Sequence, residues 1–104
     1  MKNRGFLALI VVIAVALPVM AAGPDGAALY KAKCAMCHGP DGAGQTPTGK
    51  AMKVRDLRSA DVQKQTDKEL DAIVANGKGK MPAYKGKVSE AEIDALIKYI
   101  KTMK

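Results

Sequence analysis

The chain has 104 residues, with seventeen Lys and Arg against ten Asp and Glu and a formal net charge of +7. That length leaves room for one small domain and excludes a multidomain protein, and so small a domain is marginally stable without a staple or a bound cofactor. The basic residues are not interleaved with aromatic ones, so the positive charge does not indicate nucleic-acid binding.

The N-terminus has the three-part layout of a secretory signal. Lys2 and Arg4 form a short positive segment, Phe6–Leu17 is apolar throughout, and small residues follow at Ala21 and Ala22. The apolar run is short for a membrane-spanning helix. We therefore expect a signal peptide over residues 1–22 that is cleaved, no membrane insertion afterwards, and a periplasmic or otherwise exported protein. An uncleaved anchor is the alternative, and export is common to both.

Residues 23–104 form the expected domain. Without Lys2 and Arg4 it holds fifteen basic and ten acidic residues, a formal charge of +5. It contains no Trp and no Phe, and its only aromatic residues are Tyr30, Tyr84 and Tyr99. Aromatic side chains are major contributors to core packing. We therefore expect a large bound apolar group to fill part of the interior.

A short helix is predicted over 25–33, with Asp25 as its cap or first-turn acid, and it leads into the sequence Cys34-Ala-Met-Cys37-His38. A C-x-x-C-H run is the attachment signature of c-type haem. Two thiols three positions apart can each form a thioether to one haem vinyl group, and the next residue places an imidazole beneath the iron. The motif predicts one covalently bound haem c, with Cys34 and Cys37 as its anchors and His38 as the proximal axial ligand.

Three other interpretations of the motif have less support. A disulfide between Cys34 and Cys37 would close too short a loop to stabilise much. A dithiol redox site prefers a βαβ setting, which this sequence lacks. A zinc site needs four ligands, and the chain has two Cys and one His.

The rest of the chain indicates helices without strands. Residues 39–50 are rich in Gly and Pro and are predicted to form a loop, followed by a short helix near 59–63. Thr66-Asp-Lys-Glu69 and Ser89-Glu-Ala-Glu92 are capping boxes that begin two further helices. Val88 and Ile93 are placed to form a hydrophobic staple at the second. The predicted fold is all-α, with three to four helices wrapped around one haem.

The sixth iron ligand is not His, because His38 is the only histidine, so this position is taken by Met, Lys or Tyr or stays open. Met81 is the favoured distal axial ligand, since it lies in a Gly- and Lys-rich loop between two predicted helices and precedes a proline. Met52 is the reserve candidate. Met36 lies between the two cysteines, too close to reach the opposite face, and Met103 lies at the C-terminus. A purely packing role for Met81 is the alternative.

At this point the chain resembles the class I c-type cytochromes, and the resemblance covers nearly all of 23–104. The attachment motif, a Met in a loop and a closing amphipathic helix come in that family's order. In the family the first and last helices cross through a Gly and an aromatic residue on one and a large residue and an aromatic on the other. Gly26 and Tyr30 match the first pair, and Leu96 and Tyr99 match the second.

The resemblance also implies a proline whose carbonyl accepts a hydrogen bond from the axial His, which fixes its tautomer and orients its ring. Pro47 resembles that residue, with Pro40 as the alternative. The family's tryptophan near a haem propionate has no counterpart here, and Arg55 or Tyr84 is the candidate to take its place.

Together these features predict an electron carrier rather than an enzyme. With His38 and Met81 both bound, the iron has no open position, so the chemistry is outer-sphere electron transfer between larger redox proteins. Four lysines flank Met81: Lys78, Lys80, Lys85 and Lys87. They predict acidic docking surfaces on the partners. The alternative, that these lysines only face solvent, agrees with the sequence equally well. A monomer is expected. The alternatives are a gas-binding or peroxidase-like haem protein with a displaceable sixth ligand, and a haem-containing subunit of a membrane complex.

Overall fold

The computed structural model describes residues 5, 7–16 and 23–104. Residues 7–16 are extended and exposed and form no helix. The predicted signal peptide therefore lies partly outside the described residues, and its expected cleavage site lies wholly outside them. Within the described ranges, no helix has both the length and the apolar character needed to cross a bilayer.

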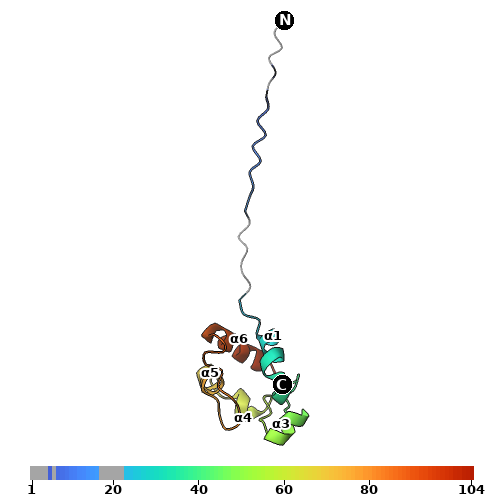
Figure 1. Cartoon of the computed structure of the whole chain (residues 1–104), viewed down its shortest axis with the longest axis vertical. Coiled ribbons are helices and arrows are strands. Elements are labelled where there is room, and N and C mark those ends of the chain that lie inside the picture. Colours follow the sequence, from blue (N-terminus) through green and yellow to red (C-terminus); the bar gives the residue numbers. More distant parts are fainter. Residues whose placement is uncertain (1–4, 6, 17–22) are drawn as a thin grey trace.

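The domain is all-α, as predicted (Figure 1). Its helices in chain order are α1 (Gly26–Lys33), α2 (Ala35–His38), α3 (Pro47–Met52), α4 (Ala60–Gln63), α5 (Asp67–Asn76) and α6 (Glu90–Ile100). The described residues thus hold six helices rather than three or four, because three of them are only four to six residues long. Over the described ranges, the only β-type pairings are two isolated bridges in the segment between α5 and α6.

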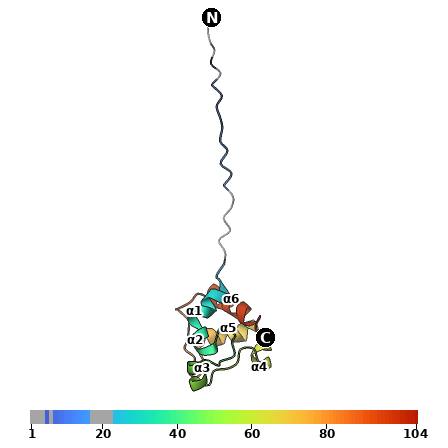
Figure 2. The ribbon, with the colours of Figure 1, turned by 90° about the vertical axis from the view of Figure 1, so that its right-hand side faces the viewer.

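The first and last helices cross in contact, as Figures 1 and 2 both show. At the crossing, Gly26 lies so close to the backbone of Ala95 that a Cβ atom would overlap the Ala95 carbonyl. Tyr30 is buried and its ring centroid lies 5.3 Å from that of Tyr99 in a tilted arrangement. Leu96 is buried in the same apolar cluster as Tyr30. Three of the four residues expected at this crossing, Gly26, Tyr30 and Tyr99, therefore meet there.

The loop expected over 39–50 is shorter than predicted. Its last part is helical, because α3 begins at Pro47 and Thr46 caps it through a hydrogen bond from Gly49 N to Thr46 Oγ1 of 2.9 Å. Proline suits the first position of a helix, where its missing N–H leaves no bond unmade. Thr46-Pro47 is a typical helix start, but the many Gly and Pro residues around it led to the prediction of a loop.

The capping predictions hold fully at one helix and half at the other. Ser89 and Glu92 form a reciprocal capping box at the start of α6, with distances of 2.9 and 3.1 Å. At α5, Thr66 Oγ1 accepts from Glu69 N at 3.1 Å, but within the described residues Glu69 gives no return bond. Val88, next to the Ser89 cap, is buried in the same apolar cluster as α6.

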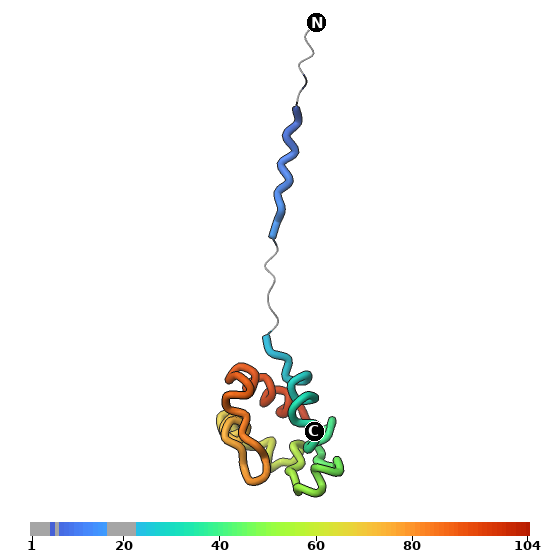
Figure 3. Tube along the Cα trace, viewed as in Figure 1, coloured from blue at the N-terminus to red at the C-terminus, as the bar shows by residue number. Residues whose placement is uncertain are grey.

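The helices are arranged as a ring, which the tube in Figure 3 shows most directly. α1, α2 and α3 form one side, α5 and the segment after it form the other, and α6 packs against both α1 and α5. The side chains that face the middle are largely apolar and come from both sides. The domain is therefore organised around its centre, where residues distant in sequence converge.

Candidate haem site

A cavity of about 410 Å³ lies inside this ring and is lined mainly by apolar side chains. Its volume falls in the range of roughly 300–1,000 Å³ that is typical of cofactor sites. Cys34 and His38 line it from the α2 side, and Met81 lines it from the segment after α5. The apolar wall includes Leu57, Leu70, Ile73, Val74, Leu96 and Ile97.

The two cysteines are free thiols at opposite ends of one helical turn. Cys34 ends α1 and caps α2, its backbone N–H donates to the Tyr30 carbonyl at 2.8 Å, and its side chain lines the cavity. Burial raises the pKa of the Cys34 thiol to about 11. Met36, between the cysteines, is 75% exposed and faces away from the interior. In the described part of the chain, no group of three or more His, Cys, Asp and Glu side chains is placed to hold a metal ion.

His38 is half-buried at the cavity wall and its Nδ1 lies 3.1 Å from the Arg55 carbonyl oxygen. A carbonyl only accepts, so Nδ1 carries the proton and Nε2 keeps its lone pair. Burial lowers the pKa of His38, and the hydrogen bond to Arg55 opposes this only in part. The imidazole is therefore neutral at physiological pH, which is the form that ligates iron.

The prediction that a proline carbonyl accepts the hydrogen bond from His38 is wrong. The structure places the Arg55 carbonyl on Nδ1, not that of Pro47 or Pro40. Pro47 is the first residue of α3, so its carbonyl points along the helix axis toward the following turn. A backbone carbonyl was expected to accept this bond and one does, but it belongs to a residue eight positions further along the chain than Pro47.

Sequence reasoning also missed the residues that hold α2 in place. The Thr46 hydroxyl lies 2.7 Å from the Met36 carbonyl and 3.0 Å from that of Cys37. Gly44 N donates to the His38 carbonyl at 2.7 Å, and the buried Tyr30 hydroxyl donates to the Gly39 carbonyl at 2.5 Å. These bonds satisfy carbonyl groups that the end of a helix leaves unpaired. The Thr-Pro sequence is the one signal that could have indicated Thr46.

Met81 belongs to the segment between α5 and α6, residues 77–89, which we call the strap and which folds back on α5. Met81 and Lys78 exchange two backbone hydrogen bonds of 3.0 and 3.2 Å, and Tyr84 N donates to the Val74 carbonyl at 3.0 Å. Gly77, with φ of +76°, ends α5, and a Cβ there would lie 2.6 Å from the Met81 carbonyl. The absence of a side chain at Gly77 therefore lets the backbone around Met81 lie against the end of α5.

Two of the four methionines after residue 22 line the cavity, Met52 as well as Met81. Met52 is the last residue of α3, on the same side of the ring as α2, whereas Met81 comes from the opposite side. Met103 packs elsewhere, against Gly42, where a Cβ would lie 2.6 Å from its sulfur. The geometry therefore narrows the sulfur candidates to the two named from the sequence.

The residues present fit a haem with two anionic propionates. Cationic side chains line part of the same cavity, and they are Lys53, Arg55, Lys78 and Lys80. The Tyr84 hydroxyl, the other candidate for a propionate contact, lies 3.1 Å from the Lys33 carbonyl and links the strap to α1. The walls of this apolar cavity carry the His38 imidazole, methionine sulfur and the Cys34 thiol, whereas Cys37, three residues further along the chain, does not line it. These groups match the chemistry of covalently held haem.

Comparison with known proteins agrees with this chemistry. The family model described as "Cytochrome C oxidase, cbb3-type, subunit III" matches residues 21–100. The chain is 37% identical over 75 residues to cytochrome c6 of Leptolyngbya boryana, covering 72% of this chain and 85% of that protein. It is 37% identical over 79 residues to cytochrome c6 of Anabaena variabilis, covering 73% of this chain and 85% of that protein.

Solved structures agree as well. The KustC0563 c-type cytochrome superimposes with a TM-score of 0.71 at 30% identity, covering 77% of this chain and 98% of that one. Cytochrome c6C from Synechococcus sp. PCC 7002 superimposes with a TM-score of 0.59 at 30% identity, covering 74% of this chain and 90% of that one. The family match over residues 21–100 spans all six helices of the described residues and the attachment motif.

Proposed function

The chain belongs to the class I family of monohaem c-type cytochromes, and we propose that it carries single electrons between larger redox proteins through a haem with His38 and Met81 as axial ligands. Members of this family carry one covalently bound haem c, and so does this chain. The haem supplies reversible one-electron chemistry when bound. The observation that supports the ligand pair best is that His38 and Met81 line one cavity from opposite sides of the ring.

In this proposal each residue has a separate task. Cys34 and Cys37 anchor the porphyrin through thioethers, which prevents loss of the cofactor from an exported protein. His38 presents Nε2 to the iron because Nδ1 is engaged by the Arg55 carbonyl. Met81 supplies a thioether sulfur, which favours the reduced iron and raises its potential. The apolar wall excludes water, so little rearrangement accompanies each transfer.

The experiment that tests the ligand pair compares Met81→Ala with Met52→Ala, since both side chains line the cavity. Each protein is made with its haem attached, and the oxidised form is examined for the weak long-wavelength absorption band of methionine sulfur on ferric haem. We expect the band in the wild type and in Met52→Ala, and its loss in Met81→Ala. A band that disappears only in Met52→Ala would move the ligand to α3.

A wild-type spectrum without the band would reject the carrier proposal in this form. It would favour a haem protein with an open sixth position, and carbon monoxide binding to the reduced wild type at neutral pH would then identify it. With the band present and carbon monoxide excluded, an enzyme that binds its substrate at the iron is ruled out.

The proposed partners are redox proteins with acidic docking surfaces. No acidic residue occurs between Asp71 and Glu90, a segment that contains Met81 and four lysines. Lys78 and Lys80 line the cavity beside Met81, so a positive surface borders the route to the iron. Such charge raises the rate of encounter with an oppositely charged partner. We further propose export by the N-terminal segment and function as a monomer.

One observation favours a second candidate, a haem-bearing subunit of a membrane oxidase. The matching family model takes its description from such a subunit. Purification of the tagged chain from its own membranes in mild detergent distinguishes the two. A free carrier is released from the membranes by a salt wash and elutes without other proteins. A subunit stays bound and purifies together with a larger haem-containing complex.

A further inference from the structure

The hydrogen bond on His38 depends on a carbonyl that the chain brings from a distant loop. Arg55 lies seventeen residues after His38, in the irregular segment between α3 and α4. Nothing in the local geometry of α2 fixes the position of that carbonyl. Whatever holds the Arg55–Asp56 peptide in place therefore sets the length and direction of the bond to Nδ1.

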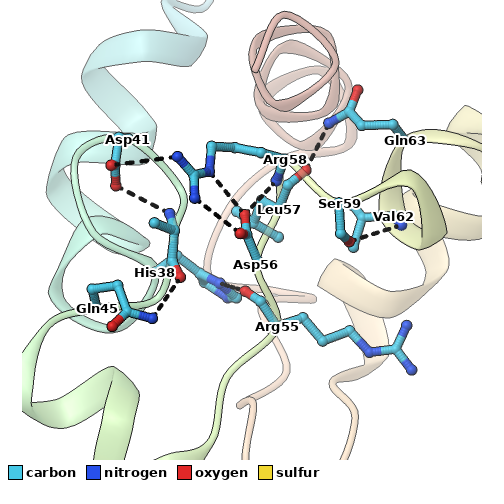
Figure 4. Close-up of polar contacts among 11 residues, drawn as sticks. His38, Asp41, Gln45, Arg55, Asp56, Leu57, Arg58, Ser59, Val62 and Gln63 are labelled. Atoms are coloured by element: carbon cyan, nitrogen blue, oxygen red, sulfur yellow. Dashed lines mark hydrogen bonds and ion pairs between the residues drawn. The ribbon is translucent and has the colours of Figure 1, made fainter. Parts of the chain in front are cut away.

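The guanidinium group of Arg58 hydrogen-bonds to the carboxylate of Asp56, the second residue of that peptide, as Figure 4 shows. Its Nε lies 3.0 Å from Asp56 Oδ1 and its Nη2 lies 3.0 Å from Asp56 Oδ2, a two-pronged pairing. Its backbone N–H donates to the same Oδ1 at 2.9 Å. Because a peptide group is planar, fixing Asp56 also restricts where the Arg55 carbonyl points.

The same guanidinium reaches the loop that follows His38. Arg58 Nη1 lies 3.9 Å from Asp41 Oδ2, and the two segments are also joined by a bond from Leu57 N to the Gly42 carbonyl of 2.8 Å. In Figure 4, Arg58 is thus the one side chain that contacts both the segment of the Arg55 carbonyl, through Asp56, and the loop after His38, through Asp41. Its hydrogen bonds to Asp56 hold the pKa of that carboxyl below its usual range, so the pair stays charged at neutral pH.

We propose that Arg58 is a positioning residue that holds the Arg55 carbonyl on His38 Nδ1 and thereby lowers the reduction potential of the haem. The inference rests on the proposed ligation of iron by His38. An acceptor on Nδ1–H increases electron donation by the ligating nitrogen, which stabilises the oxidised iron more than the reduced iron. Loosening the acceptor weakens that donation and raises the potential.

The test uses the holoprotein and relies on the sign of the change. Arg58→Met removes the two-pronged pairing with Asp56 and one positive charge, and Lys64→Met is its matched control. Lys64 is the C-cap of α4, pairs with Asp61 at 3.3 Å and is not among the residues that line the cavity. Removing a positive charge through space lowers a haem potential, since it stabilises the oxidised state. We expect Lys64→Met to leave the potential unchanged or lower it slightly.

For Arg58→Met we expect the opposite, a rise corresponding to roughly a threefold shift in the equilibrium with a reference one-electron carrier, or about 28 mV. Arg58→Lys keeps the charge but loses the two parallel hydrogen bonds to Asp56, so its potential should lie between those of the wild type and Arg58→Met. In the reduced protein, the Nδ1 proton of His38 should exchange with solvent faster in both Arg58 variants, as seen by NMR.

A fall in the potential of Arg58→Met that matches Lys64→Met, with unchanged proton exchange, would overturn the proposal and leave Arg58 as a surface charge. So would an Arg58→Lys protein identical to the wild type in both measurements. Failure of the carrier proposal is recognised separately, because it shows in the wild-type spectrum before any Arg58 variant is made.

Discussion

Thr46 joins the haem-attachment helix to the helix that follows it through a single hydroxyl group. That hydroxyl faces the Met36 and Cys37 carbonyls and accepts from Gly49 N, so it serves α2 and α3 together. Gly49 allows the approach, because a Cβ there would overlap the Cys37 carbonyl. Attachment of the haem therefore depends on contacts that are not themselves part of the attachment motif.

Replacement of Thr46 by valine should lower the free energy of unfolding of the holoprotein by about 2 kcal/mol, since a helix cap and a carbonyl partner are lost together. Thr46→Ser keeps the hydroxyl and should cost less than about 0.5 kcal/mol. Denaturant titration of both holoproteins measures the difference. Equal losses in the two variants would show that the methyl group, not the hydroxyl, is what matters.

At this scale the sequence predicted chemistry that depends on residue type. The attachment motif and Met81 could be named because thiols, an imidazole and a thioether are rare and distinctive. The acceptor on His38 could not, since every residue has a carbonyl group and only the fold decides which one arrives. The same limit hid Arg58, whose neighbours Asp41 and Asp56 become relevant only once two loops are brought together.

At the scale of helices, the contact between α5 and α6 contains a seam of like charges. Asp71 on α5 is near Asp94 on α6, with Asp67 and Glu90 also close, and its Oδ1 is shielded from water without a partner in the described residues. Burial first, and then the neighbouring Asp94 carboxyl group, raise the pKa of Asp71 to about 6. Asp71 therefore keeps its proton to a higher pH than an ordinary aspartate does.

This seam should make stability fall as pH rises. The pKa of Asp71 is about 6 in the folded state, against about 3.9 for an unfolded aspartate. The folded state thus holds the proton more tightly, and its contribution is complete below pH 4, is lost between pH 4 and pH 6, and is absent above. Relative to Asp71→Asn, the wild type should lose about 1–2 kcal/mol across that window.

Denaturant titrations of wild type and Asp71→Asn at several pH values measure this difference. Taking the difference removes the opposite effect of carboxyl groups such as Asp56 and Glu92, whose pKa values are lowered by hydrogen bonds. Parallel curves for the two proteins between pH 4 and pH 6 would show that Asp71 titrates normally.

The helices themselves were largely predictable, for local reasons. Caps at Asp25, Thr66 and Ser89 are set by side chains within three residues, and these starts were found. The crossing of α1 and α6 was known only through the family resemblance, because a glycine such as Gly26 does not reveal which backbone it will face. The short helix α3 was missed because its signal lay within a Gly- and Pro-rich stretch.

At the scale of the whole molecule, positive charge is gathered on the strap that carries Met81, and Lys78 and Lys80 of this strap line the cavity. Rising ionic strength should slow electron transfer to an acidic redox partner, because salt screens the attraction that speeds encounter. Stopped-flow mixing measures the bimolecular rate constant from about 0.01 to 0.5 M salt. A rate that does not change with salt would mean that the lysines are merely solvated.

Charge reversal at one site provides the matched comparison. Lys80→Glu, on the strap, should reduce the rate at low salt several-fold. Lys64→Glu, at the C-cap of α4 and not among the cavity-lining residues, should change it little. The net charge of the two variants is the same, so any difference between them reports where the partner docks.

The crossing of α1 and α6 also sets the order in which this protein can mature. Tyr30, just ahead of the attachment motif, is covered by residues of a helix made long after the two cysteines have emerged. Until that helix arrives, the thiols lie on an open, half-formed chain that an attachment enzyme can reach. Once it docks, α6 packs against both α1 and α5 beside the cavity. We therefore expect haem attachment to be fastest before α6 has packed against α1.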